Sequence, residues 1–314
     1  MSSSAHTLVV GESLIDIVRH ADGSEQEHVG GSPANVAVGL ARLGHDVTLA
    51  TMIGPDERGA RIADLLASEG VALTAGSVGA RETSVATSTL DATGAATYTF
   101  DLAWELDIGQ PLDGLAHVHA GSIAATLEPG ASAVLSTLQN ARPGATISYD
   151  PNARPSLMGD PDEVRAKIEQ MIGLSDVVKA SDEDIAWLYD EAPLEEILRL
   201  WGLLGPTLVV VTRGDKGALI RISTTGELTS VDAPRVEVAD TVGAGDSFMA
   251  GLISGLLEAG YLGGPQARER LRAVSLTDVR SAVDRALACA AITVSRAGAN
   301  PPLLAELSRP WSRP

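Results

Sequence analysis

The chain of 314 residues is 45% hydrophobic and carries 23 Lys+Arg against 41 Asp+Glu, a formal net charge of −18. This composition suffices for a packed core and excludes a disordered chain. The acidic balance, without a concentrated basic patch, argues against a nucleic-acid partner. The single cysteine, Cys289, excludes a disulfide framework and a cysteine-based zinc site. With no basic leader and no apolar run long enough to span a membrane, we expect a soluble cytoplasmic protein.

Short apolar runs alternate with helical patterns along most of the chain. The runs predicted to be strands, nearly continuous in Val, Leu and Ile, are Thr7–Val10, Val47–Ile53, His117–Gly121, Thr146–Asp150, Asp176–Lys179 and Thr207–Thr212. The segments predicted to be helices are Ala34–Leu43, Asp56–Glu69, Gly130–Asn140, Pro161–Leu174, Asp182–Tyr189, Ala244–Ala259 and Asp278–Arg296. This alternation predicts an α/β fold with a mainly parallel sheet.

Residues 71–106 interrupt the alternation, because they contain no good helical pattern. Thr83–Asp91 and Ala95–Phe100 alternate β-branched and small residues around a turn at 92–94, which predicts a hairpin. The stretch Ile15–His28 is also extended and polar. We expect both segments to form a small sheet beside the main layer, a candidate lid over a site. A surface hairpin without such a role explains the local sequence equally well.

The first segment that carries chemistry runs from Gly30 to Asn35 and opens a small apolar helix. Ser32 suits the N-cap and Pro33 the first helical position. Gly30 and Gly31 let the backbone approach a ligand and leave first-turn amides free. Asn35 both donates and accepts hydrogen bonds, which suits a hydroxylated ligand. An ordinary helix start that needs glycine for a turn is the alternative.

The second such segment, from Asp240 to Asp246, opens a long apolar helix. The amides of Gly243, Ala244 and Gly245 would point into one space and form an anion hole for a phosphate. The segment is neither a Walker A loop nor a dinucleotide-binding fingerprint, because the residues that follow fit neither pattern. A phosphate site of another kind is therefore predicted.

Asp246 is the candidate catalytic base. A carboxylate repels a phosphate bound next to it, so its presence there suggests a function. The obvious function is to accept a proton from an attacking hydroxyl. The loose transition state of phosphoryl transfer requires only a modest base that orients the hydroxyl. The alternative is that Asp246 merely complements the helix dipole, which is worth about 0.3–1 kcal/mol.

These two segments, about two hundred residues apart, resemble the N- and C-terminal signatures of the ribokinase-like (phosphofructokinase-B type) carbohydrate kinases. The resemblance covers almost the whole chain. It implies a single domain over residues 1–314, a three-layer α/β/α fold with a β-sheet lid at about 15–28 and 71–106, and transfer of the ATP γ-phosphate to a sugar hydroxyl with Mg²⁺ as cofactor. Partners would be a small sugar and ATP, and the exposed lid could pair with a second copy as a homodimer.

The acceptor is less sharply defined than the reaction. Residues 11–16, Gly-Glu-Ser-Leu-Ile-Asp, are most similar to fructokinases within the family, which implies fructose. A kinase of the same fold for 2-keto-3-deoxygluconate, ribose or a nucleoside is the nearest alternative. A non-catalytic sugar-binding protein is the alternative from another class.

Position by position, the resemblance implies Asp246 as the base and Gly243, Ala244 and Gly245 as the anion hole. Sugar contacts are implied at Asp16, Gly30, Gly31, Asn35 and Arg154. The Arg154 guanidinium would face the substrate or the phosphates, to which arginine binds bidentately. Phe100, in the predicted lid with Tyr98 and Trp104, is a candidate to cover the apolar face of the sugar. A hydrophobic cluster that anchors the hairpin is the alternative for these aromatic residues.

Other matches imply the nucleotide and cation sites. The turn after the strand at 207–212 resembles a nucleotide-binding turn with Thr212, Gly214 and Gly217, and residues 293–300, ending at Asn300, resemble the loop beside the adenine. A monovalent-cation site, occupied by K⁺, is implied at Asp240, Val242, Thr293, Arg296 and Gly298.

One stretch departs from the family pattern. The family often has Asn-x-x-Glu near Mg²⁺, whereas Ser181 and Asp184 stand at those positions here, just after Lys179. Both replacements keep oxygen ligands, so Mg²⁺ can still be held through water.

Overall fold

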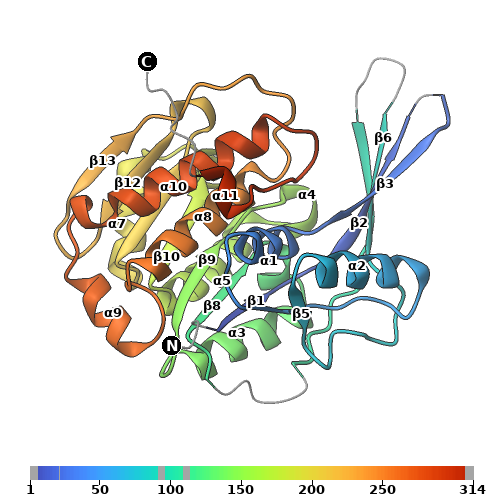
Figure 1. The fold of residues 1–314 in the computed structure, drawn as a ribbon, viewed down its shortest axis with the longest axis horizontal. Coiled ribbons are helices and arrows are strands. Elements are labelled where there is room, and N and C mark those ends of the chain that lie inside the picture. Colours follow the sequence, from blue (N-terminus) through green and yellow to red (C-terminus); the bar gives the residue numbers. More distant parts are fainter. Residues whose placement is uncertain (1–5, 21, 91–95, 109–113, 308–314) are drawn as a thin grey trace.

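The computed structural model describes residues 6–20, 22–90, 96–108 and 114–307 (Figure 1). In these ranges, nine strands form the main sheet in the order β13-β12-β11-β10-β9-β8-β1-β4-β5. Their bounds are β1 (Thr7–Val10), β4 (Val47–Ala50), β5 (Val71–Leu73), β8 (His117–Gly121), β9 (Thr146–Asp150), β10 (Val177–Ser181), β11 (Leu208–Thr212), β12 (Ala218–Ile222) and β13 (Leu228–Val231). From β11 to β5 all neighbours are parallel, and β12 and β13 add an antiparallel edge.

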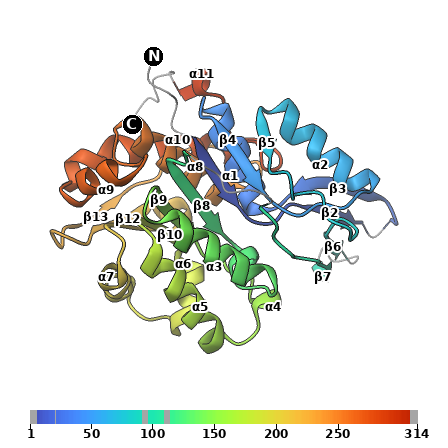
Figure 2. The same cartoon turned by 90° about the horizontal axis from the view of Figure 1, so that it is seen from below.

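Helices cover both faces of this sheet, as Figure 2 shows. One face carries α1 (Ser32–Arg42), α2 (Glu57–Ser68), α8 (Ala244–Glu258), α9 (Pro265–Arg272) and α10 (Leu276–Val294). The other carries α3 (Gly130–Ala141), α5 (Pro161–Leu174), α6 (Asp182–Tyr189) and α7 (Leu194–Leu204). Short helices lie in loops: α4 (Pro155–Met158), α11 (Leu304–Leu307) and the 3₁₀ turns η1 (Ile123–Ala125) and η2 (Gly214–Lys216). The predicted three-layer α/β/α fold is confirmed.

The sheet is buried because its central strands are apolar on both faces. Leu8, Val9 and Val10 of β1 are completely inaccessible to solvent, and they contribute alternately to the two hydrophobic cores. Such continuous apolar runs are typical of parallel strands that helices cover on both sides. The predicted set lacks the short helices α4 and α11 and also α7 and α9, although α7 buries Ile197, Leu198 and Trp201 in a clear helical spacing.

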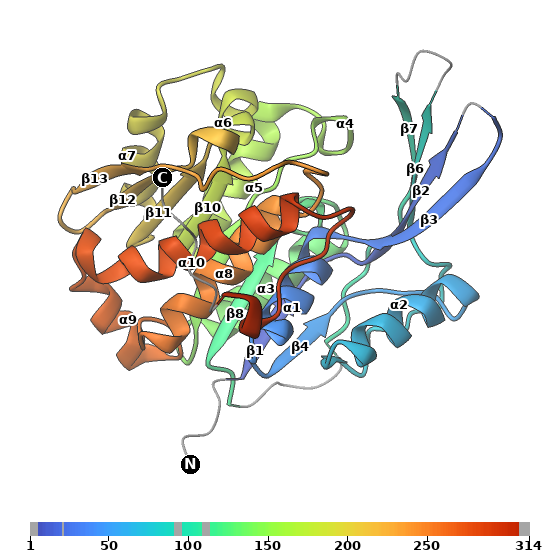
Figure 3. The same cartoon turned by 45° about the horizontal axis from the view of Figure 1, so that its top comes forward.

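A second sheet of four strands stands away from the main body (Figure 3). Its order is β3-β2-β6-β7, with β2 (Leu14–Arg19), β3 (Glu25–Gly30), β6 (Val85–Leu90) and β7 (Ala96–Asp101). We call these four strands the small sheet. Ile15 and Ile17 pack into the core, so Asp16 between them points to the opposite face.

The predicted lid segment 71–106 is wrong at both ends. Residues 71–73 form β5, which pairs with β4 in the main sheet. Trp104 is only 5% exposed and belongs to the core, where its indole nitrogen donates to the Ala124 carbonyl. Both ends carry apolar side chains, such as Val71 and Trp104, that are buried in the main body and therefore do not join the small sheet. The predicted turn at 92–94 lies outside the described residues. In the part of the chain that is described, no helix is both long and apolar enough to cross a membrane.

Candidate active site

The first turn of α8 forms the centre of the site. Gly243 caps this helix with a φ of 74°, in the left-handed region that favours glycine. A Cβ on Gly243 would also lie 2.6 Å from the Cβ of Ala299, so the loop around 299 packs directly behind the turn. The Ala244 amide contacts the Thr241 carbonyl at 3.3 Å. First-turn amides such as those of Gly245 and Asp246 have no partner within a helix and remain available to an anion.

Asp246 lies in the same turn and joins the two segments singled out in the sequence. Its carboxylate accepts a hydrogen bond from the Ser32 hydroxyl at 2.6 Å and one from the Asn35 side-chain amide at 2.8 Å. The side chain is only 8% exposed. The N-terminus of α1 and that of α8 therefore meet at one carboxylate.

One local expectation in this region is wrong. The N-cap of α1 is Gly31, with a φ of 104°, and not Ser32. Ser32 is the first helical residue, and its hydroxyl is directed at Asp246 instead of at the helix amides. A Cβ on Gly31 would lie 2.5 Å from the Glu12 carbonyl oxygen, so both the backbone angle and the space require glycine there.

A buried ion pair lies beneath the α8 turn, at the carboxyl ends of β9 and β10. Lys179 Nζ is 2.8 Å from Asp150 Oδ2, and both side chains are buried. A Cβ built on Gly245 would lie 3.0 Å from Lys179 Nζ, so the ammonium group faces the turn. Burial lowers the pKa of Lys179, but the carboxylates of Asp150, Asp184 and Asp246 outweigh it and leave the pKa raised. The group is thus a permanent positive charge at the edge of a parallel sheet where ligands bind.

The partner carboxyl group of this lysine behaves differently. Burial raises the pKa of Asp150 to about 6, although the charge of Lys179 lowers it. At neutral pH the lysine is therefore protonated and Asp150 remains mostly ionised, so the two groups form an ion pair.

The face of the small sheet opposite the core carries the predicted sugar residues. Asp16 is opposite Ala86, and Ala86 is opposite Phe100, so Asp16 and Phe100 share one face. A Cβ on Gly30 would lie 2.0 Å from Asp16 Oδ2, which explains the glycine at that position. Asp16 is exposed to solvent, but the protein around its carboxyl group removes part of its hydration and raises its pKa to about 6, while the charge of Arg154 opposes the rise. Arg154 itself is exposed, and its guanidinium donates to Asn152.

Glu12 is a residue of the site region that the sequence analysis missed. Its carboxylate is buried, accepts the Ala124 amide at 3.2 Å and interacts with the Ser122 side chain. Burial raises the pKa of Glu12 to about 7. Ser122 has a φ of 59°, which is uncommon for a residue other than glycine. The sequence marks Glu12 only by its position, because it follows Gly11 at the end of the buried strand 7–10.

The predicted nucleotide residues lie at the ends of neighbouring strands. Thr212 ends β11, beside Ser181, and Gly214 and Gly217 flank the turn that follows, both with positive φ. Ser181 and Asp184 form a capping box at the start of α6, and the second Asp184 oxygen accepts the Ala153 amide at 2.7 Å. These two side chains thus support the helix and loop directly.

The predicted monovalent-cation ligands are backbone carbonyls of four residues and the Asp240 carboxylate, and the structure shows the contacts of the side chains around them. Asp240 accepts the amides of Val242 at 3.0 Å and Gly298 at 2.8 Å, and these hydrogen bonds lower its pKa. Thr293 is buried, with its hydroxyl 2.8 Å from that of Ser247. The Arg296 side chain turns away to pair with Glu306.

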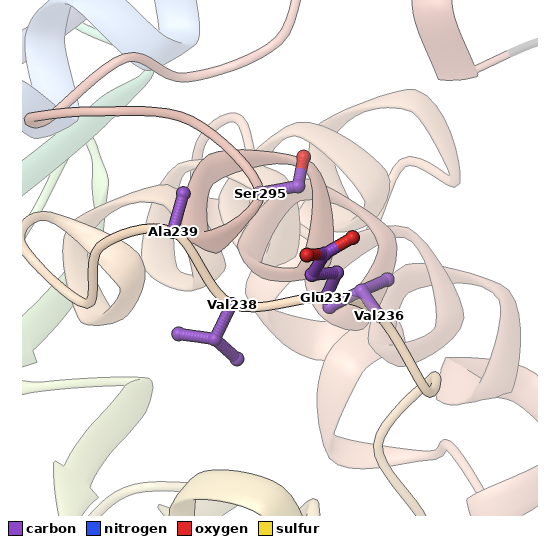
Figure 4. Close-up of a pocket in the computed structure, with 5 residues that line it drawn as sticks. All are labelled: Val236, Glu237, Val238, Ala239 and Ser295. Atoms are coloured by element: carbon purple, nitrogen blue, oxygen red, sulfur yellow. The ribbon is translucent and has the colours of Figure 1, made fainter.

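A recess of about 400 Å³ lies along the segment that leads into the α8 turn (Figure 4). It is lined by Val236, Glu237, Val238, Ala239 and Ser295. The Ala239 amide donates to the Val294 carbonyl at 2.8 Å, which holds this segment against the end of α10.

Phosphoryl transfer needs fixed hydrogen-bond donors for the transferred group and a carboxylate for the attacking hydroxyl. This edge of the sheet has both kinds of group. The class of protein that the fold and site indicate is therefore a kinase. The pattern of the pfkB family carbohydrate kinases matches residues 4–306, and the protein belongs to this family.

Individual relatives agree with the family. A fructokinase from Klebsiella pneumoniae is 34% identical over 261 residues, which cover 80% of this chain and 84% of that protein. The structure of a fructokinase from Xylella fastidiosa with bound ATP matches with a TM-score of 0.81 at 26% identity over 96% of each chain. A fructokinase double mutant from Vibrio cholerae O395, solved with fructose, ADP and potassium, matches with a TM-score of 0.76 at 27% identity over 95% of each chain.

Proposed function

We propose that this carbohydrate kinase is a fructokinase that transfers the γ-phosphate of ATP to a hydroxyl group of fructose. The observation that carries the proposal is the position of Asp246, which links the α8 amide turn to the α1 segment through Ser32 and Asn35. The fructokinases among its relatives, at about one-third identity over most of the chain, support fructose as the acceptor.

In the proposed mechanism, Asp246 accepts the proton of the attacking hydroxyl. The donors Ser32 and Asn35 fix both oxygens of its carboxylate, so the base is held in one orientation before the sugar arrives. The free amides of the α8 turn and the Lys179 ammonium receive the negative charge of the transferred group. The protein therefore supplies orientation and charge, as a loose transition state requires.

We also propose that Mg²⁺ accompanies ATP and that K⁺ supports the α8 turn. Asp150 and Asp184 offer the hard oxygen donors that Mg²⁺ prefers, and their carboxylate lone pairs beyond the hydrogen bonds described above suit contact through water. Mg²⁺ would neutralise charge on the phosphate oxygens. The potassium in the Vibrio cholerae structure, together with the contacts of Asp240, supports the K⁺ proposal.

The recess in Figure 4 is our proposed seat for the base of ATP. Val238 there is 59% exposed and Val242 nearby is 55% exposed, so an apolar ring would cover side chains that now face water. The segment runs from this recess directly into the α8 turn, which would place the triphosphate over Gly243–Gly245.

A coupled assay of ADP release tests the proposed function. We expect fructose to be the best acceptor in a panel with ribose, 2-keto-3-deoxygluconate and nucleosides, and turnover to rise when K⁺ is added. If another compound in the panel is a better acceptor, the protein is still a kinase, but its substrate is that compound and not fructose. Sugar binding without ADP release under any condition would contradict the proposal and favour a non-catalytic binding protein.

Gly30→Ala is expected to raise the KM for the sugar about tenfold or more and to leave the KM for ATP within twofold. The added methyl would occupy space now taken by Asp16 Oδ2, and the ordinary backbone angle of Gly30 removes strain as an explanation. Steady-state kinetics of both substrates check this. Gly144→Ala, whose Cβ would have only one neighbour, at 4.0 Å, is the matched control. An unchanged sugar KM would remove Asp16 from the proposed sugar site.

The KM for the sugar is also expected to rise as the pH falls through about 6. The raised pKa of Asp16, about 6, makes the carboxyl group ionised above that pH and neutral below it, and only the ionised form accepts hydrogen bonds on both oxygens. Asp16→Asn should raise the KM at pH 8 and flatten the profile between pH 5 and 8. A profile that keeps its shape in this variant would assign the pH dependence to another group, such as Glu12.

We further propose that the enzyme acts in the cytoplasm, where ATP is available. A separate proposal is that the small sheet closes over the bound sugar. Phe100 stacks on Tyr98 with ring centroids 6.3 Å apart, next to the row that holds Asp16. Among the described residues, the outer strands β3 and β7 each pair on one side only, and the other edge could join a second copy. Light scattering in the presence and absence of substrates measures this association.

A further inference from the structure

We propose that Arg42 is a positioning residue that holds the loop at 298–301 behind the α8 turn and so maintains the nucleotide site. The inference rests on the proposed function for its ligand, ATP. Arg42 is the last residue of α1, at the end opposite Ser32 and Asn35. It lies outside the catalytic contacts and acts through the groups that it binds.

The Arg42 side chain makes four hydrogen bonds to two different parts of the chain. Its Nε and Nη2 atoms donate to the two carboxylate oxygens of Glu69, at 2.8 and 2.6 Å, just beyond α2. Its Nη1 atom donates to Asn300 Oδ1 and to the Pro301 carbonyl, both at 2.6 Å. The planar guanidinium suits this double role, because its fixed fork satisfies a carboxylate on one side while a third nitrogen remains free.

The loop that Arg42 binds supports the α8 turn through two contacts. The Asn300 amide donates to the Gly298 carbonyl, and the Gly298 amide donates to Asp240 Oδ2 at 2.8 Å. Asp240 in turn accepts the Val242 amide, immediately before the turn. Ala299 lies so close to Gly243 that a methyl group would not fit between them. A displacement of residues 298–300 would therefore move the residues that face the phosphate.

Apolar packing holds the far end of this loop, where Pro301 and Pro302 are buried, but it leaves a gap near Ala299. A recess of about 80 Å³ separates α1, α2 and the loop, and Val38, Leu65, Arg42, Glu69 and Ala299 are among its lining residues. Beside this gap, the hydrogen bonds of Arg42 link the end of α1 directly to Asn300 and Pro301. Glu69 holds the guanidinium in place, and burial of the pair at about 20% exposure limits its screening by solvent.

Helix α2, which Glu69 follows, also contacts the small sheet. Arg58 and Arg61 near the start of α2 both pair with Glu27 on β3, while Glu69 at the other end pairs with Arg42. Ion pairs at the two ends of α2 thus connect the small sheet with the loop behind the phosphate site.

The test compares Arg42→Met with Arg285→Met. Arg285 makes a similar bidentate pair with Glu258 and is 22% exposed, against 20% for Arg42. Arg285 lies on α10, and its partner Glu258 is the last residue of α8, roughly 20 Å from the first turn of that helix at 1.5 Å per residue. We expect Arg42→Met to raise the calorimetric Kd of ATP and the KM of ATP at least fivefold, with the sugar KM within twofold. Arg285→Met should lower Tm similarly and leave ATP binding within twofold.

Three further measurements separate positioning from general stability. Asn300→Ala should weaken ATP binding in the same direction, and adding Arg42→Met to it should cost less than twofold more. Glu69→Gln, which keeps the loop contacts, should be milder than Arg42→Met, and Arg42→Lys should recover only part of the loss. In the protein without nucleotide, hydrogen exchange of the backbone amides of residues 298–300 should accelerate in Arg42→Met and not in Arg285→Met.

The inference is overturned if Arg42→Met and Arg285→Met change the ATP affinity equally, or if the loop exchanges at the same rate in both. Absence of turnover with any sugar in the unmodified enzyme contradicts the proposed function instead. The exchange measurement needs no substrate, so the two failures are distinguishable.

Discussion

Asp246→Asn is expected to lower kcat at least about a hundredfold, the lower end of the contribution of a positioned general base. The amide is nearly isosteric with the carboxylate but cannot take a proton from the sugar. The Ser32 hydroxyl can reverse its hydrogen bond and accept from the new amide, while Asn35 can still donate to its oxygen. We therefore expect sugar and ATP affinities close to those of the unmodified enzyme, measured by calorimetry alongside kcat.

The matched control for this variant is Asp278→Asn. Asp278 occupies the same third position in the first turn of α10 as Asp246 does in α8, and its carboxylate accepts hydrogen bonds from Ser275. Both substitutions remove a negative charge from a helix N-terminus, worth about 0.3–1 kcal/mol of stability. Similar kcat values in the two variants would show that Asp246 serves only the helix, and would remove it from the mechanism.

Lys179→Met is expected to have the largest effect on stability of any single substitution in the site. It leaves Asp150 buried without its positive partner, near Asp184 and Asp246, which costs about 3–5 kcal/mol for the loss of one member of a buried pair. The native state of a domain is stable by only about 5–15 kcal/mol, so urea unfolding should show a clear loss. The folded fraction should also lose at least about a hundredfold in kcat, because a fixed charge at the phosphate site is gone.

Two further variants separate the charge from the fold. Lys179→Met combined with Asp150→Asn removes the stranded carboxylate and should recover much of the stability, while its kcat should stay well below that of Asp150→Asn alone, which keeps the lysine charge. Arg268 on α9 forms another largely buried ion pair, with Asp176. Arg268→Met breaks this pair and should lower stability, while kcat per folded enzyme stays within twofold. Recovery of both stability and kcat in the double variant would reduce Lys179 to a structural role.

The sequence predicts the layers of this fold well because local pattern and burial agree there. The strand at 7–10 is apolar on both faces, and two layers of helices cover it. The region 71–106 fails because the decisive interactions are distant: Trp104 looks like a lid residue locally but packs beneath Gly130 and Ala124. Local pattern cannot report a partner that lies 20 or more positions away.

The candidate site shows the same division. Glycine pairs before helices mark Gly31 and Gly243 in the sequence, since their positive φ angles demand glycine. Ser32 is misread as a helix cap, because its actual acceptor, Asp246, is more than two hundred residues later in the chain. Glu12 and Arg42 escape prediction for a related reason. Their importance comes from tertiary partners, Ala124 for one and Asn300 for the other.

The hydrogen bonds of Asp246 to Ser32 and Asn35 have a consequence for the newly made polypeptide. During synthesis the α1 segment emerges long before α8, so its two donors wait without their acceptor until most of the chain has left the ribosome. No shorter product that ends before α8 can hold the complete centre, whatever part of it has already folded. If Asp246 is the base that we propose, catalytic activity requires the finished tertiary structure, and a chain halted before α8 would have none.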